Sequence, residues 1–240
     1  MLPYFYQPGL KKDMSSLILD EATSKHCVQV LRMRAGEQLL LTDGAGSKAI
    51  CTILSPERKH CLVKIEHTET QQPRQVQLSL AIAFTKNNSR NEWFLEKATE
   101  LGIGHIYPLV TARTEKEKLK AERLEQILVA AMLQSQQVYL PKLHEALPVK
   151  RFVTQPGAAG IPQKLIAHCI ERSEKIPFLQ SIQPGKSLVL MIGPEGDFTE
   201  EEVSLCLHHG YQAVSLGINR LRTETAALYG CVAFNALNYG

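Results

Sequence analysis

Hydrophobic and polar positions in residues 1–72 form short runs separated by turn-forming residues, a pattern typical of a small β-rich domain. The predicted strands are 38–42, 49–54 and 61–66. Asp43-Gly44 is a strong hairpin signal between two of these runs, and Ser55-Pro56 indicates a second turn. One helix is predicted over 21–32. Strands spaced this closely favour a small β-barrel.

The pattern changes after the polar stretch 70–74, where apolar strand-like runs begin to alternate with long helices. The predicted strands are 77–84, 105–110, 164–169, 187–192 and 211–216, and the predicted helices are 90–101, 115–137, 199–209 and 223–238. We expect Asn88 or Ser89 to cap the first of these helices and Gly102 to end it. Thr199-Glu-Glu-Glu202 is a capping box. This alternation is typical of an α/β fold with a mostly parallel sheet, so we expect two domains, 1–72 and 73–240.

Two of the predicted strands end in turns that contain glycine. The strand that ends at Ile192 runs into Gly193-Pro-Glu-Gly-Asp-Phe198, and the strand that ends at Leu216 runs into Gly217-Ile-Asn-Arg-Leu-Arg-Thr-Glu-Thr225. Open α/β sheets bind ligands at the carboxyl ends of their strands. Either turn alone is an ordinary strand-to-helix connection. The two together, the second rich in charged and hydroxyl side chains, indicate a small-molecule site.

Composition limits the classes of protein to which the chain can belong. The 240 residues are 44% hydrophobic, enough for a sizeable core, and no apolar run approaches the roughly 20 residues that span a bilayer. The first residues, Met1-Leu-Pro-Tyr-Phe-Tyr6, lack the layout of a signal peptide, so we expect a cytoplasmic protein that does not bind membranes. The six cysteines show no C-x-x-C pair and no histidine cluster at zinc spacing, so we expect mostly buried free thiols and no metal site.

Charge and motifs exclude several further classes. The net charge of +3 is too small to indicate nucleic-acid binding, which would need a local basic face. The sequence has no G-x-G-x-x-G after a predicted strand and no G-x-x-x-x-G-K-[ST], which makes a Rossmann dinucleotide site and a P-loop unlikely candidates for the pocket. It also has no G-x-S-x-G, which counts against an α/β-hydrolase.

The two turns carry a family resemblance. Ile192-Gly-Pro-Glu-Gly-Asp-Phe-Thr-Glu-Glu-Glu-Val203 and Leu216-Gly-Ile-Asn-Arg-Leu-Arg-Thr-Glu-Thr-Ala226 resemble the two signature loops of the RsmE family. Members of that family are SPOUT-class methyltransferases that methylate N3 of one uridine in 16S ribosomal RNA. Cys27-Val-Gln-Val-Leu-Arg-Met-Arg-Ala-Gly-Glu37 resembles the family's amino-terminal PUA-like RNA-binding domain. The resemblance implies a SPOUT fold with a C-terminal trefoil knot, and a homodimer.

The resemblance also implies a site for S-adenosylmethionine (SAM), formed mainly by main-chain groups of both turns, where glycine lets the backbone approach a ligand closely. The candidate residues are His168, Ile192, Gly193, Pro194, Glu195, Gly196, Leu216, Gly217, Leu221, Arg222 and Thr225. Methylation at N3 requires the uracil ring to lose a proton, which leaves negative charge on O2 and O4. We hypothesise that the catalytic residues are Arg222, whose cation stabilises that charge, and Glu224, which orients Arg222. Glu195, Glu224 and hydroxide all stay open as the general base.

Basic residues in both predicted domains are candidates for contacts with RNA phosphates, which fix the register of bound RNA. They are Lys11, Lys12, Arg32 and Arg34 in the first domain, and Lys86, Arg90 and Arg220 in the second. For the first domain, charge alone weighs this interpretation evenly against solvated surface charges, and the resemblance favours RNA. Two departures from the family pattern affect RNA contacts: Gln137 stands where the family usually has arginine, and Ile218-Asn219 replace the common Pro-Arg.

These observations favour SAM-dependent N3-methylation of a uridine in the 16S ribosomal RNA of the small ribosomal subunit. One alternative is a SPOUT ribose 2′-O-methyltransferase that acts on tRNA or rRNA. Another is a non-catalytic RNA-binding ribosome-assembly factor that has kept the fold. The intact turns, with Gly193, Gly196 and Arg222, argue against this last alternative.

Overall fold

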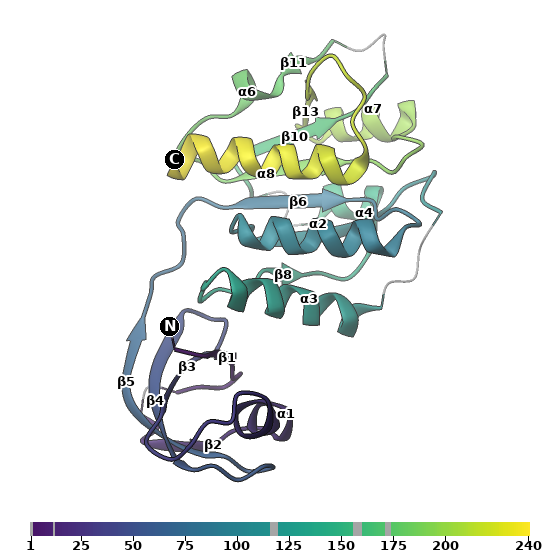
Figure 1. Ribbon diagram of the computed structural model, residues 1–240. Helices are drawn as coiled ribbons and strands as arrows, with labels where there is room; N and C mark the ends of the chain where they lie inside the picture. The colour runs from purple at the N-terminus through teal and green to yellow at the C-terminus, as the bar shows by residue number, and fades with distance from the viewer. Residues whose placement is uncertain (1, 12, 116–119, 156–159, 171–173) are drawn as a thin grey trace. The chain divides into compact units, whose positions relative to one another are not determined.

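The computed structural model describes residues 2–11, 13–115, 120–155, 160–170 and 174–240 (Figure 1). The chain divides into two compact units. Unit 1 comprises Met1–Pro73 and Met132–Leu140, and unit 2 comprises Arg74–Ala131 and Pro141–Gly240. The two units follow the predicted domains closely, with one difference. Residues 132–140 belong to unit 1, whereas the sequence pattern assigns them to the second domain.

Unit 1 contains a five-stranded sheet in the order β1-β3-β4-β5-β2. Its strands are β1 (Tyr4–Tyr6), β2 (Ser16–Ile18), β3 (Gln38–Thr42), β4 (Ser47–Ser55) and β5 (Leu62–Thr70). β1 pairs with β3 in parallel, and the other neighbours are antiparallel. The three predicted strands are confirmed. β1 and β2 were not predicted, because three residues are too few to show a period of two.

The predicted helix over 21–32 is confirmed over Glu21–Val30, but its second half is π-helical and it ends at Val30 rather than Arg32. The α-helix α1 (Glu21–Lys25) is capped by Asp20, whose carboxylate accepts a hydrogen bond from Thr23 N at 2.9 Å. It continues as a π-helical turn, η1 (His26–Val30), in which Leu31 N donates to His26 O at 3.0 Å. The wider turn leads to Arg32 in a left-handed conformation with φ of 55°, which brings the following Met33 into the core.

Unit 2 contains an eight-stranded sheet, and all of its described pairings are parallel. The order is β11-β13-β10-β12-β6-β7-β8, with β9 also paired to β7. The strands are β6 (Leu78–Ile82), β7 (His105–Val110), β8 (Lys142–Leu143), β9 (Leu147–Pro148), β10 (Gln163–Ala167), β11 (Ile176–Pro177), β12 (Leu188–Ile192) and β13 (Gln212–Ser215). The predicted strands and the mostly parallel sheet are confirmed. β8, β9 and β11 span two residues each and were not predicted.

Helices cover both faces of this sheet. They are α2 (Asn88–Glu100), α3 (Ala121–Gln134), α4 (Val149–Thr154), α6 (Phe178–Ser181), α7 (Glu200–His208) and α8 (Thr223–Tyr239). α2 and α8 pack side by side, and α8 lies on β6 and β12 (Figure 1). A methyl group on Gly230 of α8 would come within 2.4 Å of Leu190, so glycine allows this close approach. α4 and α7 pack together over a core that includes Phe152, Met191 and Phe198.

The helix ends correct two predictions and confirm two others. Asn87 caps α2, in place of Asn88 or Ser89, because its side chain accepts a hydrogen bond from Arg90 N at 3.3 Å. α3 runs from Ala121 to Gln134, shorter than the predicted 115–137, of which residues 116–119 lie outside the described part of the chain. Gly102 follows α2 with φ of 73°, the expected stop signal. The Thr199 capping box at the start of α7 is confirmed.

Three further findings concern membrane-spanning helices, metal sites and the cysteines. Among the residues that the structure describes, no helix combines the length and apolar character needed to cross a bilayer. The same residues contain no group of three or more His, Cys, Asp or Glu side chains that could hold a metal ion. The cysteines are free thiols, and all except Cys169 are buried.

Candidate functional site

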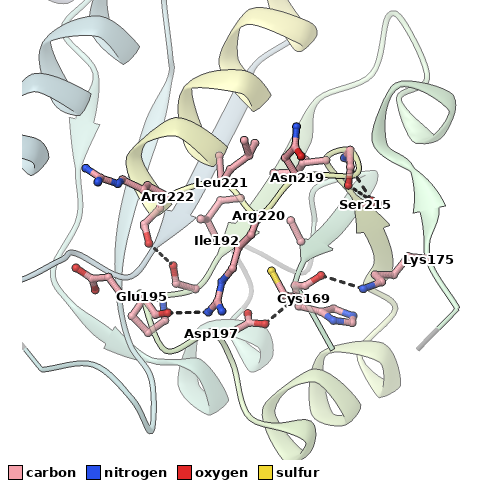
Figure 2. Close-up of a pocket in the computed structure, with 18 of the residues that line it drawn as sticks. Cys169, Lys175, Ile192, Glu195, Asp197, Ser215, Asn219, Arg220, Leu221 and Arg222 are labelled. Carbon is pink, nitrogen blue, oxygen red and sulfur yellow. Dashed lines mark hydrogen bonds between the residues drawn. The ribbon is translucent and has the colours of Figure 1, made fainter. Parts of the chain in front are cut away.

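A pocket of about 600 Å³ lies where β10, β12 and β13 end at one edge of the unit 2 sheet (Figure 2). Three segments contribute its walls: the end of β10, the turn after β12, and the segment that joins β13 to α8. The lining residues are Ala167, His168, Cys169, Lys175, Ile192, Gly193, Pro194, Glu195, Asp197, Ser215, Leu216, Gly217, Ile218, Asn219, Arg220, Leu221, Arg222, Thr223 and Ala226. The volume lies within the roughly 300–1,000 Å³ that small-molecule sites occupy.

The turn after β12 is compact and anchored in the core. Asp197 N donates to Pro194 O at 2.9 Å, and Asp197 has a left-handed backbone with φ of 65°. Phe198, which ends the turn, is fully buried in the core beneath α4 and α7. A methyl group on Gly193 would lie 3.1 Å from Phe198 N, so the turn closes tightly on itself. The pocket-lining main chain is therefore held by local hydrogen bonds and one buried aromatic ring.

The segment after β13 is tied to the first turn by two side chains. Thr223 Oγ1 donates to Gly193 O at 3.0 Å, and Arg220 Nη2 donates to Glu195 O at 3.1 Å (Figure 2). Gly217 has φ of 128°, a conformation that other residues rarely adopt. The two glycine-containing turns thus meet as one structure.

The third wall comes from the end of β10. His168 is buried, and its Nδ1 accepts a hydrogen bond from Ile170 N at 3.3 Å. Burial lowers the pKa of His168, the nearby Lys175 lowers it further, and Asp197 opposes both. Lys175 Nζ donates to the carbonyls of His168 and Ile170 at 3.3 and 2.9 Å. Nδ1 of His168 therefore acts as an acceptor in the pocket wall, and burial together with Lys175 disfavours the charged imidazolium.

Most of the predicted donor-site residues line the pocket, and two do not. Gly196 packs instead against Arg113, whose Nη1 donates to Gly196 O at 2.6 Å. Thr225 lies in the first turn of α8 and is exposed. The pocket residues that sequence reasoning missed include Asp197, Cys169 and Lys175. Asp197 and Cys169 adjoin predicted residues, whereas no local signal identifies Lys175.

The two predicted catalytic residues are placed differently from the expectation. Arg222 lines the pocket, and Figure 2 shows its side chain directed away from Cys169, Lys175 and Ser215. Glu224 is buried at the start of α8, and its carboxylate forms an ion pair with Arg90 Nε at 3.5 Å. Glu224 was predicted to orient Arg222, but its ion-pair partner in the structure is Arg90. This ion pair links the start of α8 to the start of α2.

The predicted RNA-contact residues are spread over both units. In unit 1, Lys11, Arg32 and Arg34 are exposed, and Lys12 lies outside the described residues. In unit 2, Lys86 forms an ion pair with Glu115 just before α2, and Arg90 pairs with Glu224. Arg220 is exposed but already holds the Glu195 carbonyl.

Comparison with known proteins places this site in context. Residues 71–235 match the RNA methyltransferase domain family, and residues 19–66 match the RNA methyltransferase PUA domain family. The chain is 32% identical over 231 residues to ribosomal RNA small subunit methyltransferase E of Synechocystis, an alignment that covers 93% of this chain and 74% of the relative.

Solved structures give the same result. A probable rRNA methyltransferase from Porphyromonas gingivalis superposes with a TM-score of 0.89 at 37% identity, covering 99% of this chain and 98% of that one. Ribosomal RNA small subunit methyltransferase E of Neisseria gonorrhoeae, solved bound to S-adenosyl methionine, superposes with a TM-score of 0.85 at 29% identity, covering 99% and 98%. Together with the two turns that form the pocket, these matches show that the chain belongs to the RsmE family of RNA methyltransferases, with an amino-terminal PUA domain.

Proposed function

We propose that this protein transfers the methyl group of SAM to N3 of a uridine in the 16S ribosomal RNA of the small ribosomal subunit. The observation that carries the proposal is the pocket at the carboxyl ends of β10, β12 and β13, built from both signature turns. A family relative from Neisseria gonorrhoeae was solved with SAM bound, which supports SAM as the ligand of this pocket.

The residues of the pocket fit such a donor. Ile192, Gly193, Leu216, Gly217 and Leu221 line it, and the φ of 128° at Gly217 is a conformation that favours glycine. Bound SAM supplies a methyl group already activated by a sulfonium leaving group. The protein therefore needs mainly to position the nucleophile and to stabilise charge.

In this proposal, Arg222 stabilises the negative charge that develops on the uracil. Deprotonated uracil shares its charge between N3, O2 and O4, and a guanidinium beside those oxygens stabilises the anion as it forms. Arg222 lines the pocket with its side chain directed away from Cys169, Lys175 and Ser215, so in this proposal the uracil binds on that side of the pocket (Figure 2). Glu224, paired with Arg90, serves as a positioning residue that holds the start of α8, and hence the backbone of Arg222.

Finer features of the family complete the proposal. We propose that residues 1–72 form a PUA-like barrel that holds RNA through Lys11, Lys12, Arg32 and Arg34, and that residues 73–240 form the methyltransferase domain with a C-terminal trefoil knot. The strand order supports the knot, because the chain leaves β12 and crosses β10 to form β13. We also propose a cytoplasmic homodimer. Val232 and Tyr239 of α8, seven residues apart on one side of the helix and 49% and 44% exposed, support an apolar contact face on that helix.

Two measurements test the proposal. Calorimetric titration of the protein with SAM is expected to show binding, and the absence of heat would favour a non-catalytic assembly factor. Mass mapping of 16S rRNA from a strain that lacks the gene should show the loss of a methyl group from one uracil base. A methyl group lost from a ribose would overturn N3-methylation in favour of 2′-O-methylation.

A further inference from the structure

We infer that Asp197 is a positioning residue that sets the shape of the donor pocket by bridging the turn after β12 to the end of β10. The inference rests on the proposed function of this pocket as the SAM site. Both carboxylate oxygens of Asp197 accept main-chain hydrogen bonds. Oδ2 accepts one from Cys169 N at 2.7 Å (Figure 2), and Oδ1 accepts one from Phe198 N at 2.8 Å. One side chain therefore connects two walls of the pocket.

The position of this bridge explains why it is needed. β10 and β12 are paired along their whole length, and the last partners are Ala167 and Ile192. Beyond that pair the two chains separate to form the pocket, and main-chain pairing between the strands ends. Cys169 N, two residues further along, donates to the Asp197 carboxylate in place of a strand carbonyl. The carboxylate thus continues the connection between the strands across the gap and holds the wall that carries His168.

The backbone of Asp197 points to a role for its side chain. With φ of 65°, the residue adopts a left-handed conformation that glycine adopts more readily than aspartate. Glycine would serve the turn itself, in which Asp197 N donates to Pro194 O at 2.9 Å. What glycine lacks is the carboxylate, and strained positions of this kind persist where the surrounding contacts hold them.

The charge of Asp197 also reaches the opposite wall. It lines the pocket together with His168 and Lys175, and it counteracts the lowering of the His168 pKa that burial and Lys175 cause. This supports the positioning role, which depends on the two hydrogen bonds.

Three substitutions at this position separate the bridge from the backbone conformation. Asp197→Gly removes both hydrogen bonds and relieves the left-handed backbone, whereas Asp197→Ala removes the bonds and keeps the strain. Asp197→Asn keeps the shape with a single acceptor oxygen. We expect Asp197→Gly and Asp197→Ala to weaken SAM binding in calorimetry by about tenfold, and Asp197→Asn to weaken it less. The KM for SAM should rise while the KM for small ribosomal subunits stays unchanged.

A structural readout accompanies the affinity. Amide hydrogen exchange at Cys169 should accelerate in Asp197→Gly relative to the wild-type protein, because its acceptor is gone. Glu200→Gln, a change at an exposed carboxylate in the first turn of α7, is the matched control and should alter neither quantity. Wild-type SAM affinity in Asp197→Gly would overturn the inference and leave the proposed function intact. Absence of SAM binding by the wild-type protein would overturn both.

Discussion

The two units of this protein use β-sheets in contrasting ways. In unit 1, β3 and β4 are joined by a short turn and pair antiparallel, as do β4 and β5, so the three central strands of the sheet follow one another in sequence. In unit 2, β10 pairs with both β12 and β13, and Leu165 faces Gln212 across the sheet. Parallel neighbours require long connections, and all of their carboxyl ends meet at one edge.

This difference in strand direction determines where the segments that follow the strands gather. In an antiparallel sheet the turns alternate between the two edges, so main-chain groups from several turns do not gather at one edge. In unit 2, the segments that follow β10, β12 and β13 enclose the pocket. The candidate RNA contacts of unit 1 are instead exposed basic side chains such as Arg32 and Arg34. We therefore expect changes in unit 2 to affect donor binding and chemistry, and changes in unit 1 to affect RNA affinity.

The largest effect is expected from Phe198→Ala. Phe198 is 0% exposed and joins the pocket turn to the core of unit 2. Loss of a buried phenylalanine should lower the free energy of unfolding of unit 2 by about 3–5 kcal/mol and abolish SAM binding. Chemical denaturation and calorimetry measure the two effects.

Leu39→Ala is the matched change in unit 1, because Leu39 is also 0% exposed. It should lower the stability of unit 1 by about 2–5 kcal/mol while SAM still binds. Loss of SAM binding in Leu39→Ala as complete as in Phe198→Ala would break the separation of roles between the units.

Arg222→Ala should lower the kcat for methylation by about 10²–10³, because an electrostatic contact to the developing uracil anion is lost. Arg222 is exposed, so the variant should fold and bind SAM. Steady-state methylation of small ribosomal subunits measures the effect. A folded, SAM-binding Arg222→Ala protein with the full methylation rate would remove Arg222 from the mechanism.

The contrasting variant in unit 1, Arg34→Ala, should raise the KM for small ribosomal subunits severalfold and leave kcat unchanged.

A third effect concerns pH and lies in unit 2 outside the pocket lining. His105 Nδ1 and His144 Nε2 are 3.1 Å apart, and His144 stacks on Tyr107 with ring centroids 3.9 Å apart. Burial, followed by His105 and Lys142, lowers the pKa of His144 to about 4. The unfolded chain binds this proton near pH 6.5, and the folded chain binds it only at lower pH. Stability is therefore full above about pH 6.5 and falls as the pH drops towards 4.

His144→Phe tests this pH dependence, because phenylalanine keeps the stacking and cannot take up a proton. The wild-type protein should lose about 1–2 kcal/mol more of its unfolding free energy than the variant between pH 7 and pH 4, after allowance for partial solvent screening. Urea denaturation at a series of pH values measures this difference. Parallel pH profiles for the two proteins would contradict the prediction.

The smallest effects are expected at helix caps. Thr199→Ala removes the capping box of α7 and should lower the stability of unit 2 by about 1 kcal/mol. Asp20→Ala removes the cap of α1 in unit 1 and should cost a similar amount in that unit. Thermal unfolding measures both changes. If Thr199→Ala also weakened SAM binding, the start of α7 would have to be included in the donor site.

Sequence periodicity predicted the long strands and helices of both units, because each buried face repeats along a continuous segment. β12 is buried at every residue, as expected for a central parallel strand. Two-residue strands such as β8 and β11 were missed, since they form only where a neighbouring strand offers partners. The π-helical turn at 26–30 was also missed, because a helix with one extra residue in a turn shows no distinct local pattern.

In the candidate site, too, some features could be predicted from the sequence and others could not. The glycine-rich turns at Gly193 and Gly217 could be identified from local signals, and so could the charged Arg222. The pairing of Glu224 with Arg90 could not, because the two residues lie on α8 and α2, which only the packed sheet brings together. The amino-acid sequence by itself determined the longer strands and helices, the family and the turns that contain the site, since these depend on local spacing and composition. The tertiary structure alone decided which strand ends meet, that Lys175 enters the pocket and that Asp197 joins two of its walls, because each of these depends on contacts between segments far apart in the chain.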